Sequence, residues 1–145
     1  MYTLDGAIGA RGSLRAFDGG TVGVVIAGTP YKCPAPPYEA VFRAENFLRR
    51  QRVYGRSEVR TFVPDQQPLP VAEPLVGSAV RDLLGKSGIQ YHPTFVLKEV
   101  NPDTKALSFD NGERVRLDLL LYVPPHQTPD VVANSPPRRK QWMGQ

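Results

Sequence analysis

The only cysteine of the chain, Cys33, lies in a proline-rich segment directly after an apolar run, residues 21–27. In an open α/β sheet, the loop after the carboxyl end of a strand is where ligands and catalytic groups lie. A thiolate at such a place is both a nucleophile and a redox group, and a nearby cation such as Lys32, or the start of the next helix, favours it. The alternative is an inert thiol in a loop.

A histidine, His126, follows the last apolar run of the chain, residues 117–123, after two prolines. If both apolar runs form parallel strands of one sheet, their carboxyl ends meet at the same edge, which would bring Cys33 and His126 together. A histidine there can donate or accept a proton near neutral pH. The alternative is that His126 only terminates the strand. We predict Cys33 and His126 as catalytic residues and assign no residue to a cofactor or a metal.

Other side chains border the same predicted edge. Tyr31 and Tyr122 either line the crevice or pack beside the strand ends. Asp65 follows the second predicted strand, where dinucleotide-binding folds carry an acidic ribose ligand, but no G-x-G-x-x-G sequence occurs in the chain. Prolines after the first strand would obstruct the close approach of a pyrophosphate. We therefore expect no NAD binding by this domain, and expect Asp65 and His92 to be turn or strand-end residues.

Several other kinds of site are disfavoured. Two histidines and one cysteine at distant positions give no metal-ligand spacing, and the scattered acidic residues form no carboxylate pair for hydrolysis. A single cysteine excludes an internal disulfide and fits a reducing cytosol. The net charge of +4 includes three cations near the end of the chain, Arg138, Arg139 and Lys140, so the rest is nearly neutral and nucleic acid is not an expected partner.

Composition and periodicity predict one layered domain. The 145 residues are 41% hydrophobic, no window approaches the roughly 18 apolar residues of a membrane span, and the start lacks a signal-peptide pattern. We expect helices over 4–17, 38–51 and 75–84, and strands over 21–27, 58–63, 89–92, 94–100, 106–109, 113–117 and 117–123. This order predicts a three-layer, Rossmann-like α/β fold with a central parallel sheet and a three-stranded antiparallel meander. The domain should span residues 1–133, followed by a basic, disordered tail at 134–145.

Three segments carry a resemblance to a known family. They are Tyr31–Ala40 (YKCPAPPYEA), Val76–Pro93 (VGSAVRDLLGKSGIQYHP), and Asp118–His126 (DLLLYVPPH). In order and spacing they resemble sulfide:quinone oxidoreductases and flavocytochrome c sulfide dehydrogenases, of the FAD-dependent pyridine nucleotide-disulfide oxidoreductases. The resemblance covers residues 2–133 and corresponds to the second, NAD(P)-binding-like domain of those flavoproteins.

The resemblance implies a thiol-assisted oxidation of sulfide, with electrons passed through FAD to a quinone or another acceptor. Cys33 would be one of two cysteines that carry sulfur near the flavin. The second cysteine and the flavin-binding half of such enzymes have no counterpart in these residues, so we expect this chain to bind no FAD and to be inactive alone. The implied partners are the flavin-binding half and, through the surface it would otherwise cover, a second copy of the chain. The implied location is cytoplasmic, or peripheral to a membrane.

Two alternatives from other classes stay open. The chain could be an independent domain that binds a small ligand or a protein partner, in which case it should be a monomer without an exposed apolar patch. It could also be a sulfur carrier that uses its single cysteine, in which case Cys33 should carry a persulfide.

Overall fold

A parallel sheet with β1 (Gly20–Ile26) at its centre organises the computed structural model, which describes residues 3–135. The strands follow the order β3–β2–β1–β7, and all neighbours are parallel. The other three strands are β2 (Ser57–Phe62), β3 (Ile89–His92) and β7 (Leu119–Val123). Five consecutive residues of β1 are buried, because both faces of this strand are covered by other elements.

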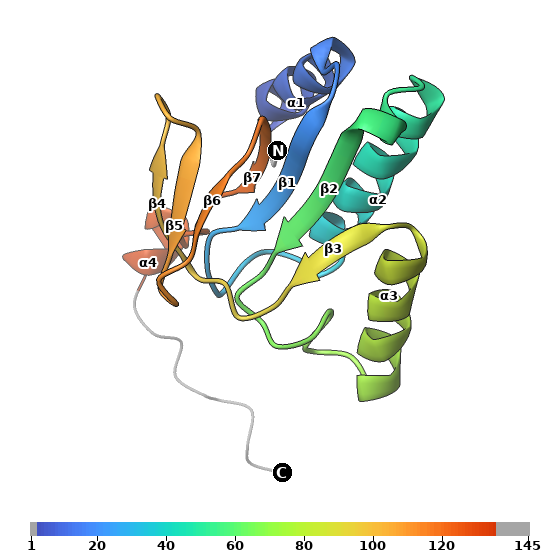
Figure 1. Ribbon diagram of the computed structural model, residues 1–145. Helices are drawn as coiled ribbons and strands as arrows, with labels where there is room; N and C mark the ends of the chain where they lie inside the picture. The colour runs from blue at the N-terminus through green and yellow to red at the C-terminus, as the bar shows by residue number, and fades with distance from the viewer. Residues whose placement is uncertain (1–2, 136–145) are drawn as a thin grey trace.

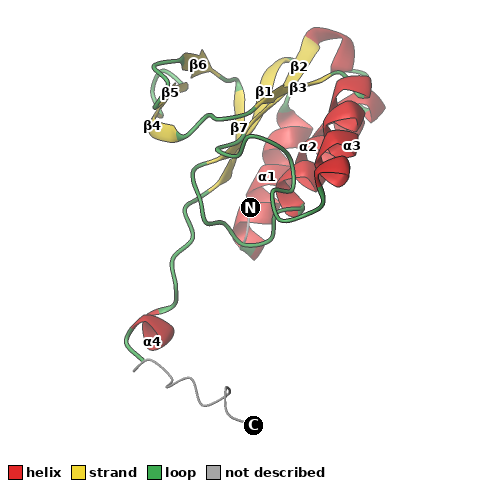
Figure 2. Cartoon of the chain, turned by 90° about the horizontal axis from the view of Figure 1, so that it is seen from below, coloured by secondary structure: helices red, strands yellow, loops and turns green. Residues whose placement is uncertain are grey.

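Helices cover one face of the parallel sheet, and a second, antiparallel sheet covers part of the other (Figures 1 and 2). The helices are α1 (Leu4–Ala16), α2 (Pro36–Arg50) and α3 (Pro74–Lys86). The second sheet consists of β4 (Leu97–Asn101), β5 (Ala106–Phe109) and β6 (Arg114–Arg116). A 3-10 turn (Tyr54–Arg56) and a short helix, α4 (Asp130–Ala133), complete the described elements. The expected three-layer fold is confirmed.

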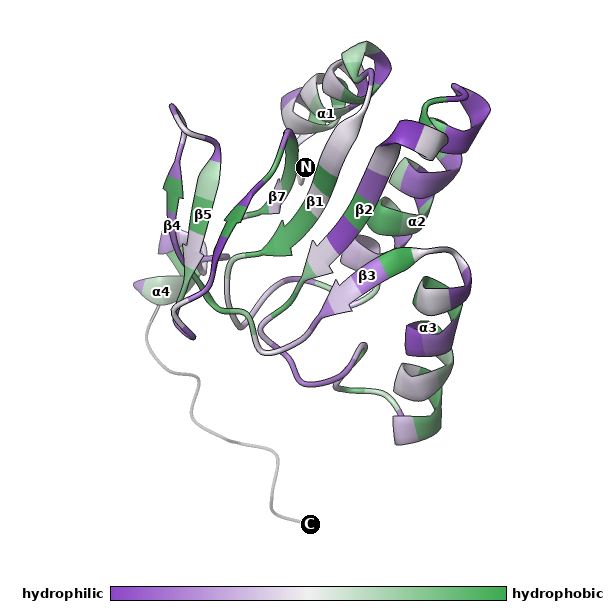
Figure 3. Cartoon of the chain, viewed as in Figure 1, coloured by the Kyte–Doolittle hydropathy of each residue, from purple (hydrophilic) through white to green (hydrophobic). Residues whose placement is uncertain are grey.

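Two apolar clusters hold the layers together. Alternate residues of β1, such as Val22, Val24 and Ile26, pack with Val41 and Leu48 of α2 on the helical face. On the opposite face, the buried side chains are Val25, Phe62, Leu107, Phe109 and Leu117. The strands of the parallel sheet and the inner helix face therefore form the apolar interior, as the hydropathy colouring of β1 also shows (Figure 3).

A close contact fixes the position of the segment between the two sheets. Gly23 of β1 faces the side chain of Leu117, and a Cβ atom at Gly23 would overlap that side chain. Asp118 then accepts a hydrogen bond from the N–H of Thr21 at 2.8 Å, which ties the start of β7 to the start of β1. Glycine at position 23 thus allows the second sheet to approach the first closely.

Side-chain turns join the antiparallel strands as their sequences predict. The Oδ1 atom of Asn101 accepts hydrogen bonds from the N–H groups of Asp103 and Thr104, both at 3.0 Å. Asn111 does the same for Glu113 at 3.0 Å, and Gly112 has a positive φ of 86°. The strand expected over 94–100 begins only at Leu97, because the preceding backbone pairs with the loop after β2, including Phe95 N–H to Val63 C=O at 2.9 Å.

The apolar stripes of α1 and α3 are only partly covered. On α3, Leu84 is buried, whereas Leu75 is 84% exposed and Leu83 is 52% exposed. On α1, Leu4 and Ile8 are exposed as well. Both helices therefore present apolar side chains on surfaces that no described residue covers.

None of the helices within residues 3–135 combines the length and the apolar character needed to cross a membrane. Most of the predicted tail, residues 136–145, lies outside the described residues.

Candidate functional site

The loop between β1 and α2 presents Cys33 at the carboxyl edge of the parallel sheet. The Cys33 side chain is exposed, and its backbone has a left-handed φ of 59°, uncommon for a residue other than glycine. Figure 2 views the molecule from the side toward which the parallel strands point, with the loops after β1 and β2 in front. The structure therefore leaves the thiol open to solvent at the edge where open α/β sheets carry their chemistry.

His126 lies at the same edge, because β7 runs beside β1 with Ile26 opposite Val123. The N–H of Lys32 donates a hydrogen bond to Nδ1 of His126, which is half-buried. The structure thus brings His126 into contact with the residue next to Cys33, across 94 positions of sequence. An imidazole whose Nδ1 accepts a hydrogen bond carries its proton on Nε2 when it is neutral. The catalytic roles of Cys33 and His126 stay predictions.

A second contact holds the other flank of Cys33. The hydroxyl of Tyr31 donates to Oδ2 of Asp65 at 2.9 Å, which joins the loop after β1 to the loop after β2. The carbonyl of Asp65 accepts from Thr94 N–H at 3.2 Å, which ties the loop after β2 to the segment after β3. The sequence does not reveal this pair, because its members are 34 residues apart and each residue type has a common local role.

Two tyrosines, buried Tyr38 and half-buried Tyr91, lie near this edge. Burial raises the pKa of Tyr38 far above its ordinary value of 10, with smaller contributions from neighbouring tyrosines and Asp65. Burial likewise raises the pKa of Tyr91 to about 12. Both hydroxyls therefore keep their protons at neutral pH and act as part of the support below the loops rather than as bases.

The carboxyl edge does not fit a dinucleotide in the usual mode. A dinucleotide-binding helix directs free N–H groups of its first turn at the pyrophosphate. In α2, Pro36 and Pro37 have no N–H, and the N–H groups of Tyr38 and Glu39 both donate to the Ala35 carbonyl, at 3.0 and 3.1 Å. The acidic group expected to bind a ribose, Asp65, is already bonded to Tyr31.

The remaining sequence candidates lie elsewhere. His92 is the last residue of β3. Its ring lies on the sheet face opposite the helices and stacks on Phe62, with the ring centroids 4.6 Å apart. Tyr122 borders a pocket between β7 and β4, with Leu97 and Pro125, and so does not share a crevice with Tyr31. Among residues 3–135, no three His, Cys, Asp or Glu side chains are grouped as metal ligands would be.

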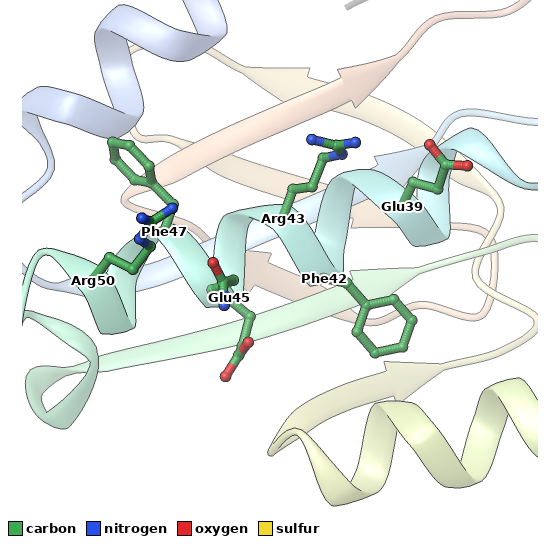
Figure 4. A pocket seen from close by; sticks show the side chains of 7 residues that line it. Glu39, Phe42, Arg43, Glu45, Phe47 and Arg50 are labelled. Atoms are coloured by element: carbon green, nitrogen blue, oxygen red, sulfur yellow. The ribbon is translucent and has the colours of Figure 1, made fainter.

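A depression on the outer surface of α2 is not a convergent site (Figure 4). All residues that line it belong to this one helix, and the side chains of Phe42 and Phe47 point to opposite sides of it. Charged residues such as Glu39 and Arg43 are solvent-exposed there. We therefore place the candidate site at the carboxyl edge, around Cys33.

Comparison with known proteins agrees with this fold. Residues 11–124 match the family described as sulfide dehydrogenase (flavocytochrome c) flavoprotein chain, central. The sulfide:quinone oxidoreductase of Aquifex aeolicus is similar in structure, with a TM-score of 0.68 and 22% identity over 85% of this chain and 29% of that one. The ferredoxin reductase of the CYP199A2 system from Rhodopseudomonas palustris has a TM-score of 0.63 and 19% identity, over 83% and 27%. A comparison with curated protein sequences found no match.

These findings first define the class: the chain has the fold of one domain of the flavoprotein oxidoreductases and spans less than a third of the length of the two structures just named. The family match, which covers most of the described residues, then identifies it further. The chain belongs to the family of the central domain of the flavocytochrome c sulfide dehydrogenase flavoprotein chain.

Proposed function

We propose that this domain supplies a sulfur-handling thiol, Cys33, to a sulfide-oxidising flavin enzyme. The observation that carries the proposal is the exposed Cys33 beside the Lys32–His126 contact, in a chain of this family. The flavin-binding part of the enzyme would be the partner of the carboxyl edge. The enzyme would act in the cytoplasm or at a membrane surface.

The residues of this chain account for the thiol half of such a reaction. The Cys33 thiolate would form an S–S bond to the sulfur of hydrosulfide, whose S–H bond breaks with release of its proton, and two electrons would pass to an acceptor. FAD, when it is held by the flavin-binding part, supplies that acceptor. His126 holds the Lys32 backbone through Nδ1, so its neutral ring carries its proton on Nε2. Lys32, which precedes Cys33 in the sequence, is exposed and adds a positive charge to the loop.

The same edge argues against NAD(P) as a ligand of this domain. Proline at the first two positions of α2 and the Tyr31–Asp65 hydrogen bond remove the groups that would bind a pyrophosphate and a ribose. We infer that electrons enter or leave through the flavin partner only. The isolated chain should therefore be inactive in sulfide oxidation.

The test uses the purified chain with FAD, sulfide and a quinone analogue. We expect no flavin absorbance in the purified protein and no reduction of the quinone analogue above a protein-free control. Clear turnover by this chain alone would contradict the proposal, because it would show that a flavin site is complete within these residues.

The exposed apolar side chains of α3 favour a second candidate, association with another protein surface. On α3, Leu75 and Leu83 are 84% and 52% exposed, and Val71, in the loop before this helix, is 83% exposed. If this surface normally meets another part of the enzyme, the isolated chain should form homodimers through it. Light scattering distinguishes an association surface from an independent domain. Homodimers support the association surface, and a strict monomer at all concentrations favours an independent domain.

A third candidate, a sulfur carrier, uses the same thiol without a flavin. It requires that a persulfide on Cys33 be passed to an acceptor thiol. Incubating the persulfidated chain with a small thiol and following the intact mass tests this: release of sulfur at a rate no faster than from persulfidated glutathione would exclude the carrier.

A further inference from the structure

A groove lies on the face of the parallel sheet opposite the helices, beside Phe62 and His92, the last residues of β2 and β3. It has a volume of about 420 Å³ and is lined by Arg60, Phe62, His92 and Phe95 on one side and by residues 113–116 on the other. We call it the β6 groove. The second sheet leaves the outer part of β2 and β3 uncovered (Figures 1 and 2), so that Glu58 and Gln90 are exposed. The groove therefore lies between β6 of the second sheet and the uncovered face of β2 and β3.

One wall of the β6 groove is a strand edge with open backbone groups. The second sheet has the order β4–β5–β6, so β6 is terminal. Phe109 N–H donates a hydrogen bond to Glu113 C=O at 3.0 Å, and Leu117 N–H donates to Lys105 C=O at 3.1 Å. Between these two positions, Val115 lies opposite Leu107 of β5. In an antiparallel ladder these bonded pairs alternate, so the N–H and C=O groups of Arg114 and Arg116 point away from β5.

The charges of the groove select a partner. Arg114 and Arg116 are exposed and share the outer side of β6, whereas Val115 packs inward. Arg60 adds a cation on the floor, partly balanced by its ion pair with Glu58, and Glu113 adds one exposed carboxylate to the lining. Pairing β6 with a second copy of itself would place arginines opposite arginines, which is unfavourable. An acidic strand would meet no such repulsion on the outer side.

The inner side of the groove offers an apolar floor. His92 stacks on Phe62, and Phe95 contacts both rings, with centroid distances of 5.4 Å to Phe62 and 5.5 Å to His92. A strand added next to β6 would direct alternate side chains onto this floor and the others toward Arg114 and Arg116. The matching sequence alternates apolar and acidic residues.

We propose that the β6 groove binds an extended, acidic peptide segment of a partner protein, which adds as a fourth strand to the β4–β5–β6 sheet. Main-chain hydrogen bonds to residues 114 and 116 supply affinity, and alternate side chains supply specificity, as in other cases of strand addition. Neither Cys33 nor His126 lines the groove, and the proposal does not depend on the function proposed for Cys33.

The test measures binding of a fluorescent peptide of alternating Glu and Val, about six residues long, to the whole chain by anisotropy. A Lys–Val peptide tests charge, and a Glu–Val peptide with N-methyl groups on the amides that face β6 tests main-chain bonding without any change to the protein. We expect the Glu–Val peptide to bind, and its affinity to fall as the salt concentration rises. Bound peptide should slow amide hydrogen exchange at Arg114 and Arg116.

Replacing both arginines, Arg114→Ser with Arg116→Ser, should weaken binding roughly tenfold, because two exposed charge contacts are lost. The matched control, Arg43→Ser with Arg50→Ser on α2, removes the same charge from another exposed surface and should leave binding unchanged. The proposal would be overturned if the Lys–Val peptide or the N-methylated peptide bound as tightly as the Glu–Val peptide. It would also be overturned if the control pair weakened binding equally, or if the peptide left the amides of residues 114 and 116 unprotected. Protection of those amides by self-association without peptide would overturn it as well.

Discussion

Replacing Tyr31 by Phe removes the hydroxyl that donates to Asp65 and tests whether this contact holds the loop of Cys33. The Tyr31–Asp65 hydrogen bond, 2.9 Å long and half-buried, joins two loops and involves a carboxylate acceptor. Hydrogen bonds to charged groups contribute about 1.5–3 kcal/mol, and the partial exposure of this one favours the low end. We therefore expect the free energy of unfolding to fall by about 1.5 kcal/mol, roughly a tenfold change in the unfolding equilibrium constant.

The assay is urea unfolding followed by circular dichroism, in a double-mutant cycle with Asp65→Ala. The two substitutions should be non-additive by about 1 kcal/mol, because each removes the same interaction. Amides of the β1–α2 loop should exchange faster in Tyr31→Phe, since the loop opens more often. Tyr122→Phe is the matched control: its hydroxyl makes no hydrogen bond within the described residues, and its effect should stay within about 0.5 kcal/mol. Additive effects, or unchanged loop exchange, would refute the reasoning.

Three further outcomes follow from single contacts. Gly23→Ala should lower the free energy of unfolding by about 1–3 kcal/mol, because its Cβ would overlap the buried side chain of Leu117. The control Gly9→Ala, in open space on α1, should not destabilise the protein. Equal effects of the two substitutions in denaturant titrations would argue against the close contact at Gly23. Burial, with a smaller effect of Arg60, lowers the pKa of His92 below 6.5, so the unfolded chain binds more protons than the folded one in that range. Stability should fall as pH drops below about 6.5, less so in His92→Phe; identical pH profiles would show that His92 is not responsible. Because Cys33 is exposed, iodoacetamide should alkylate it fully in the native protein, and protection seen by intact mass would contradict the loop conformation.

The layers of this protein could be predicted from its sequence because local patterns determine them. The apolar run at β1 can only be buried on both faces, and the Asn101 and Asn111 turns specify hairpins whatever lies around them. The edge shared by Cys33 and His126 followed from the same logic, since parallel strands end together.

Contacts between distant loops and the coverage of surfaces could not be predicted in that way. The Tyr31–Asp65 hydrogen bond depends on how two proline-rich loops fold back, and no local pattern specifies it. The stripe on α3 has clean helical spacing, yet Leu75 and Leu83 remain exposed, because spacing gives the direction of a side chain relative to its helix and not what lies opposite. The open edge of β6 likewise becomes visible only once strand order is known.

The most direct test of a sulfur-handling site at Cys33 is transfer of sulfur from a polysulfide, followed by intact mass under native conditions. The thiolate would attack a sulfane sulfur, one S–S bond would form on Cys33, and the bond it replaces would break with its electron pair leaving on the shorter polysulfide. We predict a mass gain of one sulfur atom at Cys33, formed more slowly in His126→Ala but at an unchanged rate in the distant control Lys98→Ala. No added sulfur, or the same rate in all three proteins, would contradict a site built from Cys33 and His126.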